Sequence, residues 1–128
     1  MKFLLDTCTF LWVVTDDDTL SPASKTVYSD PSNEVFLSAV SVWEIMVKFS
    51  LGRLHLPIPF DQFMTDQRDR HGIMALPLEE HATLHLPKLP SHHRDPFDRM
   101  LICQAIHHQL TIVTPDEHIT QYPVRAFW

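Results

Sequence analysis

Short apolar runs alternate with amphipathic segments along the whole of this chain, and this is the pattern of strands alternating with helices. Five runs have the length and composition of strands: residues 2–6, 35–38, 73–76, 110–114 and 124–127. Because parallel neighbours need a crossover connection, the alternation predicts an α/β domain with a central, mainly parallel sheet.

Six helices are expected between these strands, over residues 9–14, 22–29, 42–51, 60–70, 79–86 and 96–108. Ser21 and Pro22 have the chemistry of an N-cap and a first helical turn, and Gly52 is typical of a helix end. The prolines between residues 87 and 90 should break the chain before the last long helix. With only two glycines, Gly52 and Gly72, the loops are expected to be short.

Composition fits one globular domain that spans residues 1–128. The chain has 128 residues and is 45% hydrophobic, enough for one continuous core. It contains no apolar run of 18 residues, and the apolar run after Lys2 already ends at Asp6, so neither a membrane span nor a signal peptide is expected. Two cysteines, Cys8 and Cys103, are too few for a disulfide framework. A cytoplasmic location is the expectation.

The formal net charge of -6 argues against a broad basic surface for nucleic acid. Any contact with a polyanion must then come from local basic clusters. Two divalent cations bound among acidic side chains would offset about four negative charges.

Four acidic residues stand at positions where a folded chain has little use for a charge. Asp6 ends the first predicted strand and Asp116 follows the fourth, so both lie at carboxyl ends, where sites gather in parallel sheets. Each is also an ordinary turn or cap residue when considered alone, and Asp116 could cap a short helix. Thr7 and Thr114 beside them offer hydroxyls that can hold a water, a phosphate or a carboxylate.

Asp98 heads the apolar stripe of its helix, in register with Leu101, Ile102 and Ala105. The alternative is a structural role in the first helical turn, which suits Asp95 as the N-cap but does not explain an acid that faces inward. A part for Asp95 in the site stays open.

Glu44 allows two interpretations. Ser41 and Glu44 have the spacing of a capping box, and Lys48 lies one turn further on as an ion-pair partner. The predicted helix is nevertheless apolar nearly all round, which places Glu44 at the start of a buried helix and favours function.

Four segments in this order together resemble the PIN-domain ribonucleases, specifically the VapC-type toxins of bacterial toxin–antitoxin pairs. They are residues 4–7 (LLDT), 41–45 (SVWEI), 94–102 (RDPFDRMLI) and 113–116 (VTPD), and the match continues to residues 122–124 (YPV) and Trp128. The resemblance implies a three-layer α/β/α fold, usually a homodimer, with acids that hold Mg²⁺ or Mn²⁺, RNA as the substrate, and a small antitoxin encoded beside the toxin. By position, the family's conserved acids fall on Asp6, Glu44, Asp98 and Asp116. Cys8 and Pro115 depart from the family pattern, and Pro115 bears on the direction of Asp116.

Carboxylate ligands of this kind suit hydrolysis of RNA phosphodiester bonds by metal-activated water. In this hypothesis Asp6 and Asp98 are the main ligands, Glu44 binds the metal or orients the water, and Asp116 serves a second metal or an outer shell. The products would carry 5'-phosphate and 3'-hydroxyl ends.

Candidates for binding the RNA are Thr7, Arg94, Arg99 and Thr114, with Lys48, Arg53, His92 and His93 as further basic residues. Arg99 has a more ordinary alternative as an ion-pair partner of Asp95. Trp43 and Trp12 could stack on a base, although burial is the better expectation for both.

Other functions remain as alternatives. His81 and His85 have the spacing of two ligands on one helix face, but the glutamate of a zinc-protease helix is missing, so scattered histidines are expected. A noncatalytic PIN-like module that acts through a protein partner is the main rival from another class. The segment from Leu54 to Arg70 could line an antitoxin groove, form the dimer contact, or simply pack on the sheet.

Overall fold

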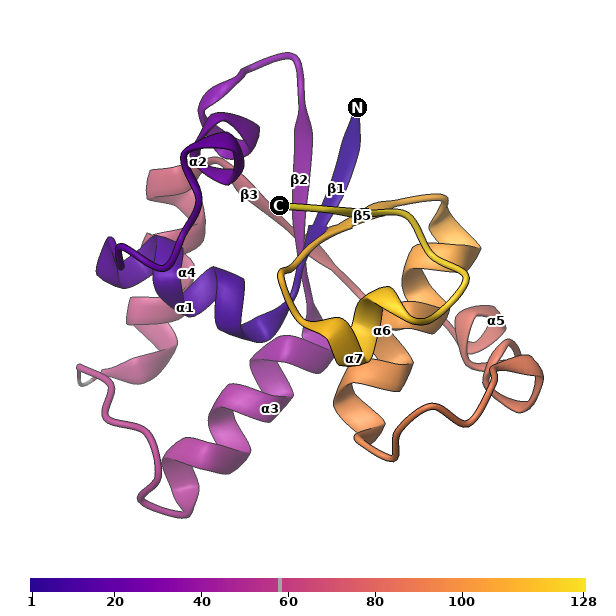
Figure 1. The fold of residues 1–128 in the computed structure, drawn as a ribbon. Helices are drawn as coiled ribbons and strands as arrows, with labels where there is room; N and C mark the ends of the chain where they lie inside the picture. Colours follow the sequence, from indigo (N-terminus) through magenta and orange to yellow (C-terminus); the bar gives the residue numbers. More distant parts are fainter. Residues whose placement is uncertain (58) are drawn as a thin grey trace.

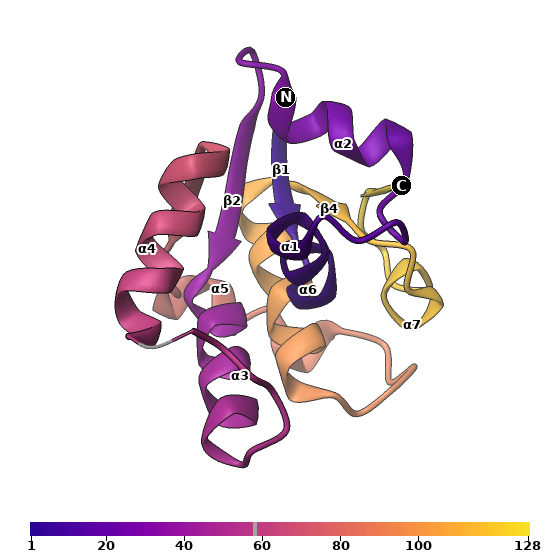
Figure 2. The same cartoon turned by 90° about the vertical axis from the view of Figure 1, so that its left-hand side faces the viewer.

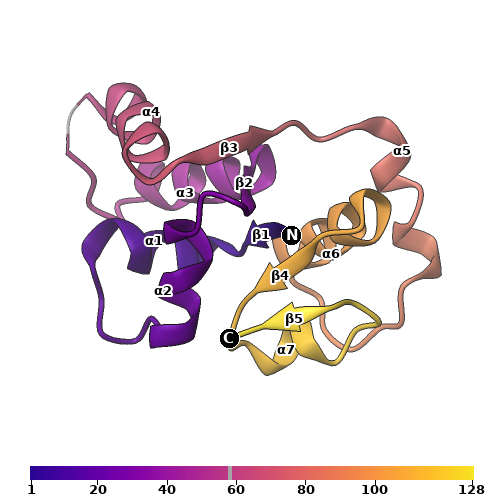
Figure 3. The same ribbon diagram turned by 90° about the horizontal axis from the view of Figure 1, so that it is seen from above.

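Five parallel strands form the central sheet of the computed structural model, which describes residues 1–57 and 59–128. Residue 58, within the segment from Leu54 to Arg70, lies outside the described residues. The strands are β1 (Lys2–Leu5), β2 (Glu34–Ser38), β3 (Ile73–Leu76), β4 (Thr111–Val113) and β5 (Ala126–Phe127), in the order β3-β2-β1-β4-β5 (Figure 3). All four pairings are parallel, and the central strand places Leu4 beside Phe36 and Ile112. The prediction of a parallel sheet is confirmed.

Both faces of the sheet are covered by helices, because the strands are apolar on both sides. Phe3 and Leu5 point into the cluster under α1 (Thr7–Thr15), α2 (Pro22–Ser29) and α4 (Phe60–His71), whereas Leu4 points into the cluster under α6 (Pro96–His108). Figures 1 and 3 show α1, α2 and α4 on one side of the sheet and α5 (Glu80–Thr83) and α6 on the other. This is the expected three-layer α/β/α arrangement.

The helix α3 (Ala39–Ser50) continues directly from β2 and extends beyond the carboxyl end of the sheet (Figure 2). Its N-cap is Ser38, whose hydroxyl accepts a hydrogen bond from the backbone of Val40 and donates to the side chain of Gln104 in α6. Gln104 is fully buried and also donates to the carbonyl of Pro77. One buried amide therefore joins α6 to the start of α3 and to the chain after β3.

Several predicted boundaries were wrong for local reasons. Helix α1 begins at Thr7, two residues earlier than expected, because Asp6 caps it, and α3 begins at Ala39 because Ser38 caps it. The expected helix over residues 79–86 is split into α5 and the 3₁₀ turn η1 (Leu86–Lys88), whose Pro87 lacks an N–H for a longer α-helix. The short helix α7 (Glu117–Thr120) begins after Asp116, which caps it, and this confirms the possibility that Asp116 caps a short helix.

The segment from Leu54 to Arg70 packs on the sheet layer through its apolar side chains. Met64 is buried in the core, and Leu54, Leu56 and Phe63 lie against it. Within the described part of the chain, no helix has the length and apolar character needed to cross a bilayer.

Candidate metal-binding active site

The four predicted acids belong to four different helices that meet beyond the carboxyl ends of the strands. Asp6 is the N-cap of α1, Glu44 lies in α3, Asp98 is in the first turn of α6, and Asp116 is the N-cap of α7. In Figure 1, these helices surround the lower ends of the central strands. The parallel sheet therefore gathers side chains that are up to 110 residues apart in sequence.

Asp6 is held rigidly at the start of α1. Its Oδ1 accepts a hydrogen bond from the backbone of Thr9 at 2.7 Å, and its Oδ2 accepts one from the hydroxyl of Thr114 at 2.5 Å. The carboxylate is buried, and burial raises its pKa even though these hydrogen bonds oppose the shift; the charge of Asp116 raises it further. A positive charge nearby would remove this penalty.

Glu44 occupies the interior of α3 rather than its cap. Because the helix begins at Ala39, the predicted capping box of Ser41 and Glu44 is not formed. Oε1 of Glu44 instead accepts a hydrogen bond from Thr7 at 2.6 Å, and Oε2 lies 2.7 Å from Nζ of Lys48. The predicted ion pair with Lys48 is thus present, and the side chain is buried with both oxygens engaged.

Asp98 carries the largest electrostatic perturbation of the four. Its pKa is raised from 3.8 to about 6, mainly by burial and further by the charges of Asp95, Glu44 and Asp116. A hydrogen bond with His93 opposes this rise in pKa, with 3.2 Å between Nε2 of His93 and Oδ2 of Asp98. The inward direction inferred from the helix stripe is confirmed, since Leu101, Ile102 and Ala105 are all buried.

Asp95 performs the capping role that its position predicts. Its Oδ1 accepts hydrogen bonds from the backbone of Phe97 and of Asp98, at 2.9 and 3.2 Å. It therefore fixes the start of α6 and adds negative charge beside Asp98.

The hydroxyl of Thr114 links Asp116 to Asp6. The backbone N–H of Asp116 donates to Oγ1 of Thr114 at 3.0 Å, and Oδ1 of Asp116 accepts from the backbone of His118 at 2.9 Å. Pro115, between Thr114 and Asp116, is exposed and does not prevent the hydrogen bond from the backbone of Asp116 to Thr114. Asp116 is only partly buried, so it lies at the rim of the group and acts as a cap as well as a charge.

The chemistry of this donor set fits a hard divalent cation. The carboxylates of Asp6, Glu44, Asp98 and Asp116 offer oxygen ligands, and each of the two raised pKa values shows that negative charge is unfavourable here without a counter-charge. Burial and the neighbouring Asp6 also raise the pKa of the Cys8 thiol, which keeps it protonated. The site is therefore suited to binding a cation and not to forming a thiolate nucleophile.

Comparison with known proteins decides the family. A model of the PIN domain matches residues 3–124 of the chain. The chain belongs to the PIN-domain family. Nucleases of this family generally use divalent metals.

This PIN domain has relatives among toxin–antitoxin proteins. It is 30% identical to Ribonuclease VapC16 of Mycobacterium tuberculosis over 101 residues, which make up 79% of this chain and 67% of that protein. Its fold is similar to a chain of VapBC2 from Rickettsia felis, solved with a promoter DNA fragment, with a TM-score of 0.73 at 14% identity over 100% of this chain and 99% of that one. A chain of VapBC-1 from nontypeable Haemophilus influenzae gives a TM-score of 0.66 at 16% identity, over 99% of this chain and 97% of that one.

The basic residues of the PIN domain are used unequally. Lys48 is partly exposed beside Glu44, and Arg94 is exposed on the loop before α6. Arg99 does not pair with Asp95 as considered from the sequence. Its Nη1 donates to the carbonyl of Pro90 and to the hydroxyl of Tyr122, both at 2.9 Å, so much of its hydrogen-bonding capacity holds the loop before α6.

Tyr122 and His93 support the site in a way that the sequence did not reveal. The buried Tyr122 hydroxyl lies 2.8 Å from Nδ1 of His93, whose other ring nitrogen contacts Asp98. The sequence indicates His93 only as a further basic residue. No periodicity marks a loop residue of this kind, because its contacts depend on the position of the chain after α7.

The expected burial of Trp43 is wrong. Its exposed fraction is 59%, although its ring still meets that of Phe97 edge to face with 4.8 Å between centroids. Trp12 is partly buried against Trp128, as expected. An exposed indole on the helix that carries Glu44 is available to stack on an unpaired base.

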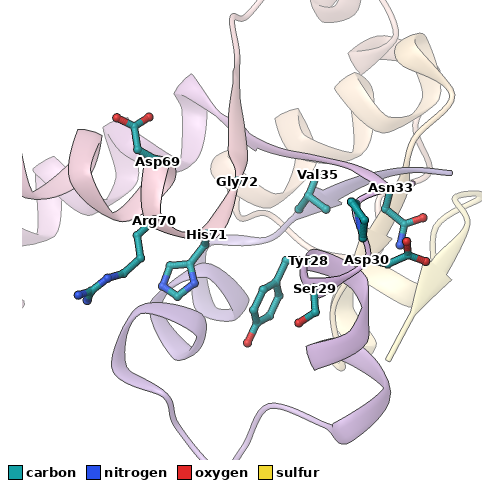
Figure 4. Close-up of a pocket in the computed structure, with 10 residues that line it drawn as sticks. Tyr28, Ser29, Asp30, Asn33, Val35, Asp69, Arg70, His71 and Gly72 are labelled. Atoms are coloured by element: carbon teal, nitrogen blue, oxygen red, sulfur yellow. The ribbon is translucent and has the colours of Figure 1, made fainter.

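A cavity of the PIN domain lies away from the acids. It has a volume of about 590 Å³ and lies near the amino ends of β2 and β3, where Val35 and Gly72 line it. Figure 4 shows Tyr28 and His71 side by side at this cavity, and their rings meet edge to face with 5.7 Å between centroids. Neither Asp6, Glu44, Asp98 nor Asp116 lines it.

The Thr114 hydroxyl is expected to matter for activity because it joins two of the acids. Thr114→Val removes the donor to Asp6 and the acceptor for Asp116 while keeping the shape, and we expect a loss of about 10- to 100-fold in RNA cleavage, as for other outer-shell residues. Initial rates at saturating Mn²⁺ measure this effect. Thr111→Val is the matched control, because Thr111 is also buried and lies at the far end of β4, the strand that Thr114 follows, away from the acids. Equal losses in both variants would contradict a specific role for Thr114.

Proposed function

We propose that this protein is a Mg²⁺- or Mn²⁺-dependent endoribonuclease that acts as the toxin of a toxin–antitoxin pair in the cytoplasm. The observation that carries the proposal is the convergence of four carboxylates from separate helices at one end of a parallel sheet, where burial raises the pKa values of Asp6 and Asp98. The relationship to a VapC ribonuclease supports RNA as the substrate.

Each acid has a role that follows from its surroundings. Asp6 and Asp98 are the proposed principal ligands, because both are partly or fully buried and repelled by neighbouring acids. Glu44 orients the attacking water or binds the metal, with Thr7 and Lys48 fixing its two oxygens. Asp116 at the rim serves a second metal or an outer shell.

When bound, a divalent cation lowers the pKa of a coordinated water and neutralises charge that develops on the scissile phosphate. The residues of the chain hold the substrate around this centre. Lys48 and Arg94 are the proposed phosphate contacts, with Arg99 as a further contact. Thr7 and Thr114, proposed earlier for substrate, more directly hold the carboxylates, since their hydroxyls already bond Glu44 and Asp6.

Metal removal is the direct test of the reaction. Purified protein with Mg²⁺ or Mn²⁺ should cut a single-stranded RNA into products with 5'-phosphate and 3'-hydroxyl ends, and EDTA should stop the reaction. End-labelled RNA treated with phosphatase or kinase identifies these ends. Persistent 2',3'-cyclic phosphate products in EDTA would rule out the proposed mechanism. Absence of cleavage with either metal would leave the noncatalytic module as the better description.

A partner protein is the second part of the proposal. The structural neighbours were solved as VapBC assemblies, which supports a small antitoxin for this chain, and we also propose a homodimer. An apolar groove of about 310 Å³ between α1 and residues 54–57, with Phe63 at its side, is the proposed antitoxin surface. Expression should arrest growth, and coexpression of a short neighbouring reading frame should relieve the arrest through a complex that copurifies.

A further inference from the structure

Four of the nine histidines gather on the face of the domain formed by α5 and the carboxyl end of α6. His107 lies at the centre of this histidine cluster, which comprises Glu79, His81, His85, His107 and His108. The expectation that the histidines are scattered is wrong for this set. Residues on α5 and its flanks meet the end of α6 only after the chain folds.

Ligand atoms of Glu79, His107 and His108 all lie within 4.8 Å of one another, the one such group of three or more within residues 1–57 and 59–128. Nε2 of His107 is 3.9 Å from Oε2 of Glu79. Glu79 stands at the N-cap position of α5, yet its side chain makes no capping hydrogen bond, and the carboxylate is exposed. These spacings need only small adjustments for three ligands to share one ion at about 2 Å each.

His85 orients the central imidazole. Nδ1 of His107 lies 3.4 Å from Nε2 of His85, so the tautomer with a proton on Nδ1 donates to His85 and leaves a lone pair on Nε2, toward Glu79. Metal-binding histidines commonly use their second ring nitrogen in this way. His81 stacks on the same ring, with 6.4 Å between centroids.

His108 supplies an independent observation. Its Nε2 is enclosed and has no hydrogen-bond partner among the described residues. A buried polar atom without a partner is unfavourable, so a ring in this state is expected to gain stability from a ligand or from a shift of rotamer. The cluster therefore contains an unsatisfied donor or acceptor beside two other metal-ligating side chains.

We propose that Glu79, His107 and His108 form a second metal site, selective for a borderline transition-metal ion such as Zn²⁺, with His85 as a positioning residue. Imidazole ligands favour such ions over Mg²⁺, whereas the all-carboxylate site favours the hard ions. The two sites are separate, because Asp98 and His108 stand ten residues apart on α6, about 15 Å along its axis. The bound ion joins the four-residue helix α5 to the end of α6.

Zinc binding to the purified full chain, with any affinity tag removed, tests the proposal. In millimolar Mg²⁺ at about pH 7.5, calorimetric titration with ZnCl₂ should show one ion per chain. Zn²⁺ should also raise the melting temperature. His107→Ala and Glu79→Gln should each weaken Zn²⁺ binding at least tenfold, and His85→Ala should weaken it by about 10- to 100-fold.

The control is His55→Ala, which removes an exposed histidine away from the cluster and should leave Zn²⁺ binding unchanged. Melting temperatures measured in EDTA check that each variant folds. If His107→Ala is unstable, Glu79→Gln still tests the site, because Glu79 is exposed and its substitution should not affect folding. Equal affinity in wild type and both ligand variants would overturn the proposal. Zn²⁺ binding that Mg²⁺ displaces, or that Asp98→Asn abolishes, would also overturn it by placing the ion among the catalytic acids.

Discussion

Asp98→Asn is expected to lower the rate of RNA cleavage by about three orders of magnitude, which corresponds to about 4 kcal/mol of lost transition-state stabilisation. The substitution keeps the size of the side chain and its place on α6, but removes the negative charge that a divalent cation needs. The measurement is the initial rate on a labelled RNA at saturating Mn²⁺, together with the Mn²⁺ concentration for half-maximal activity.

The matched control for this prediction is Asp61→Asn. Asp61 also stands in the first turn of a long helix, α4, but it is exposed and remote from the acids of the site. Its neutralisation should leave the rate within about twofold of wild type, as expected for a surface change. Asp98→Asn with wild-type activity would contradict the proposed reaction, while a loss in both variants would point to a general effect of charge.

Asp98→Asn is also expected to stabilise the metal-free protein at neutral pH. The pKa of Asp98 is raised to about 6 in the folded state, mainly by burial, from 3.8. Between these two values the folded state holds more protons than the unfolded state, so the contribution of Asp98 to stability falls as pH rises through this window. Above about pH 6 the full penalty applies to the wild type and is absent from Asp98→Asn.

A penalty of about 1 to 2 kcal/mol is expected after allowance for the partial exposure of Asp98, or several degrees in melting temperature. Melting curves in EDTA from about pH 4 to pH 7 measure it as the difference between the variant and the wild type. That difference should grow with pH. Added Mn²⁺ should then stabilise the wild type much more than the variant and reduce or reverse the difference. A gap that is constant with pH would show that the charge of Asp98 is not the cause.

The type of each main element could be predicted from the sequence because local patterns are sufficient for it. The apolar runs of β1 and β2 and the periodicity of α6 depend on neighbours in the chain. Capping is also local, but Asp6 directly follows β1 and Ser38 is itself the last residue of β2, so these two helices begin two or three residues earlier than the sequence predicts. The short α7 and the break between α5 and η1 are too small to give a periodic signal.

The sequence by itself determined which residues were available for a metal site, namely four acids at strand ends and on helices. It also determined the family pattern that links these acids. The spacing predicted Lys48 as a partner of Glu44, but only the tertiary structure decided the long-range partners. Thr114 bonds Asp6 and Thr7 bonds Glu44, because the parallel sheet brings the ends of distant strands together, and Tyr122 holds His93 beside Asp98. The histidine cluster on α5 and α6 has the same origin: Glu79 is distant in the sequence from His107 and His108, and the packing of α5 against α6 places ligand atoms of these three residues within 4.8 Å of one another.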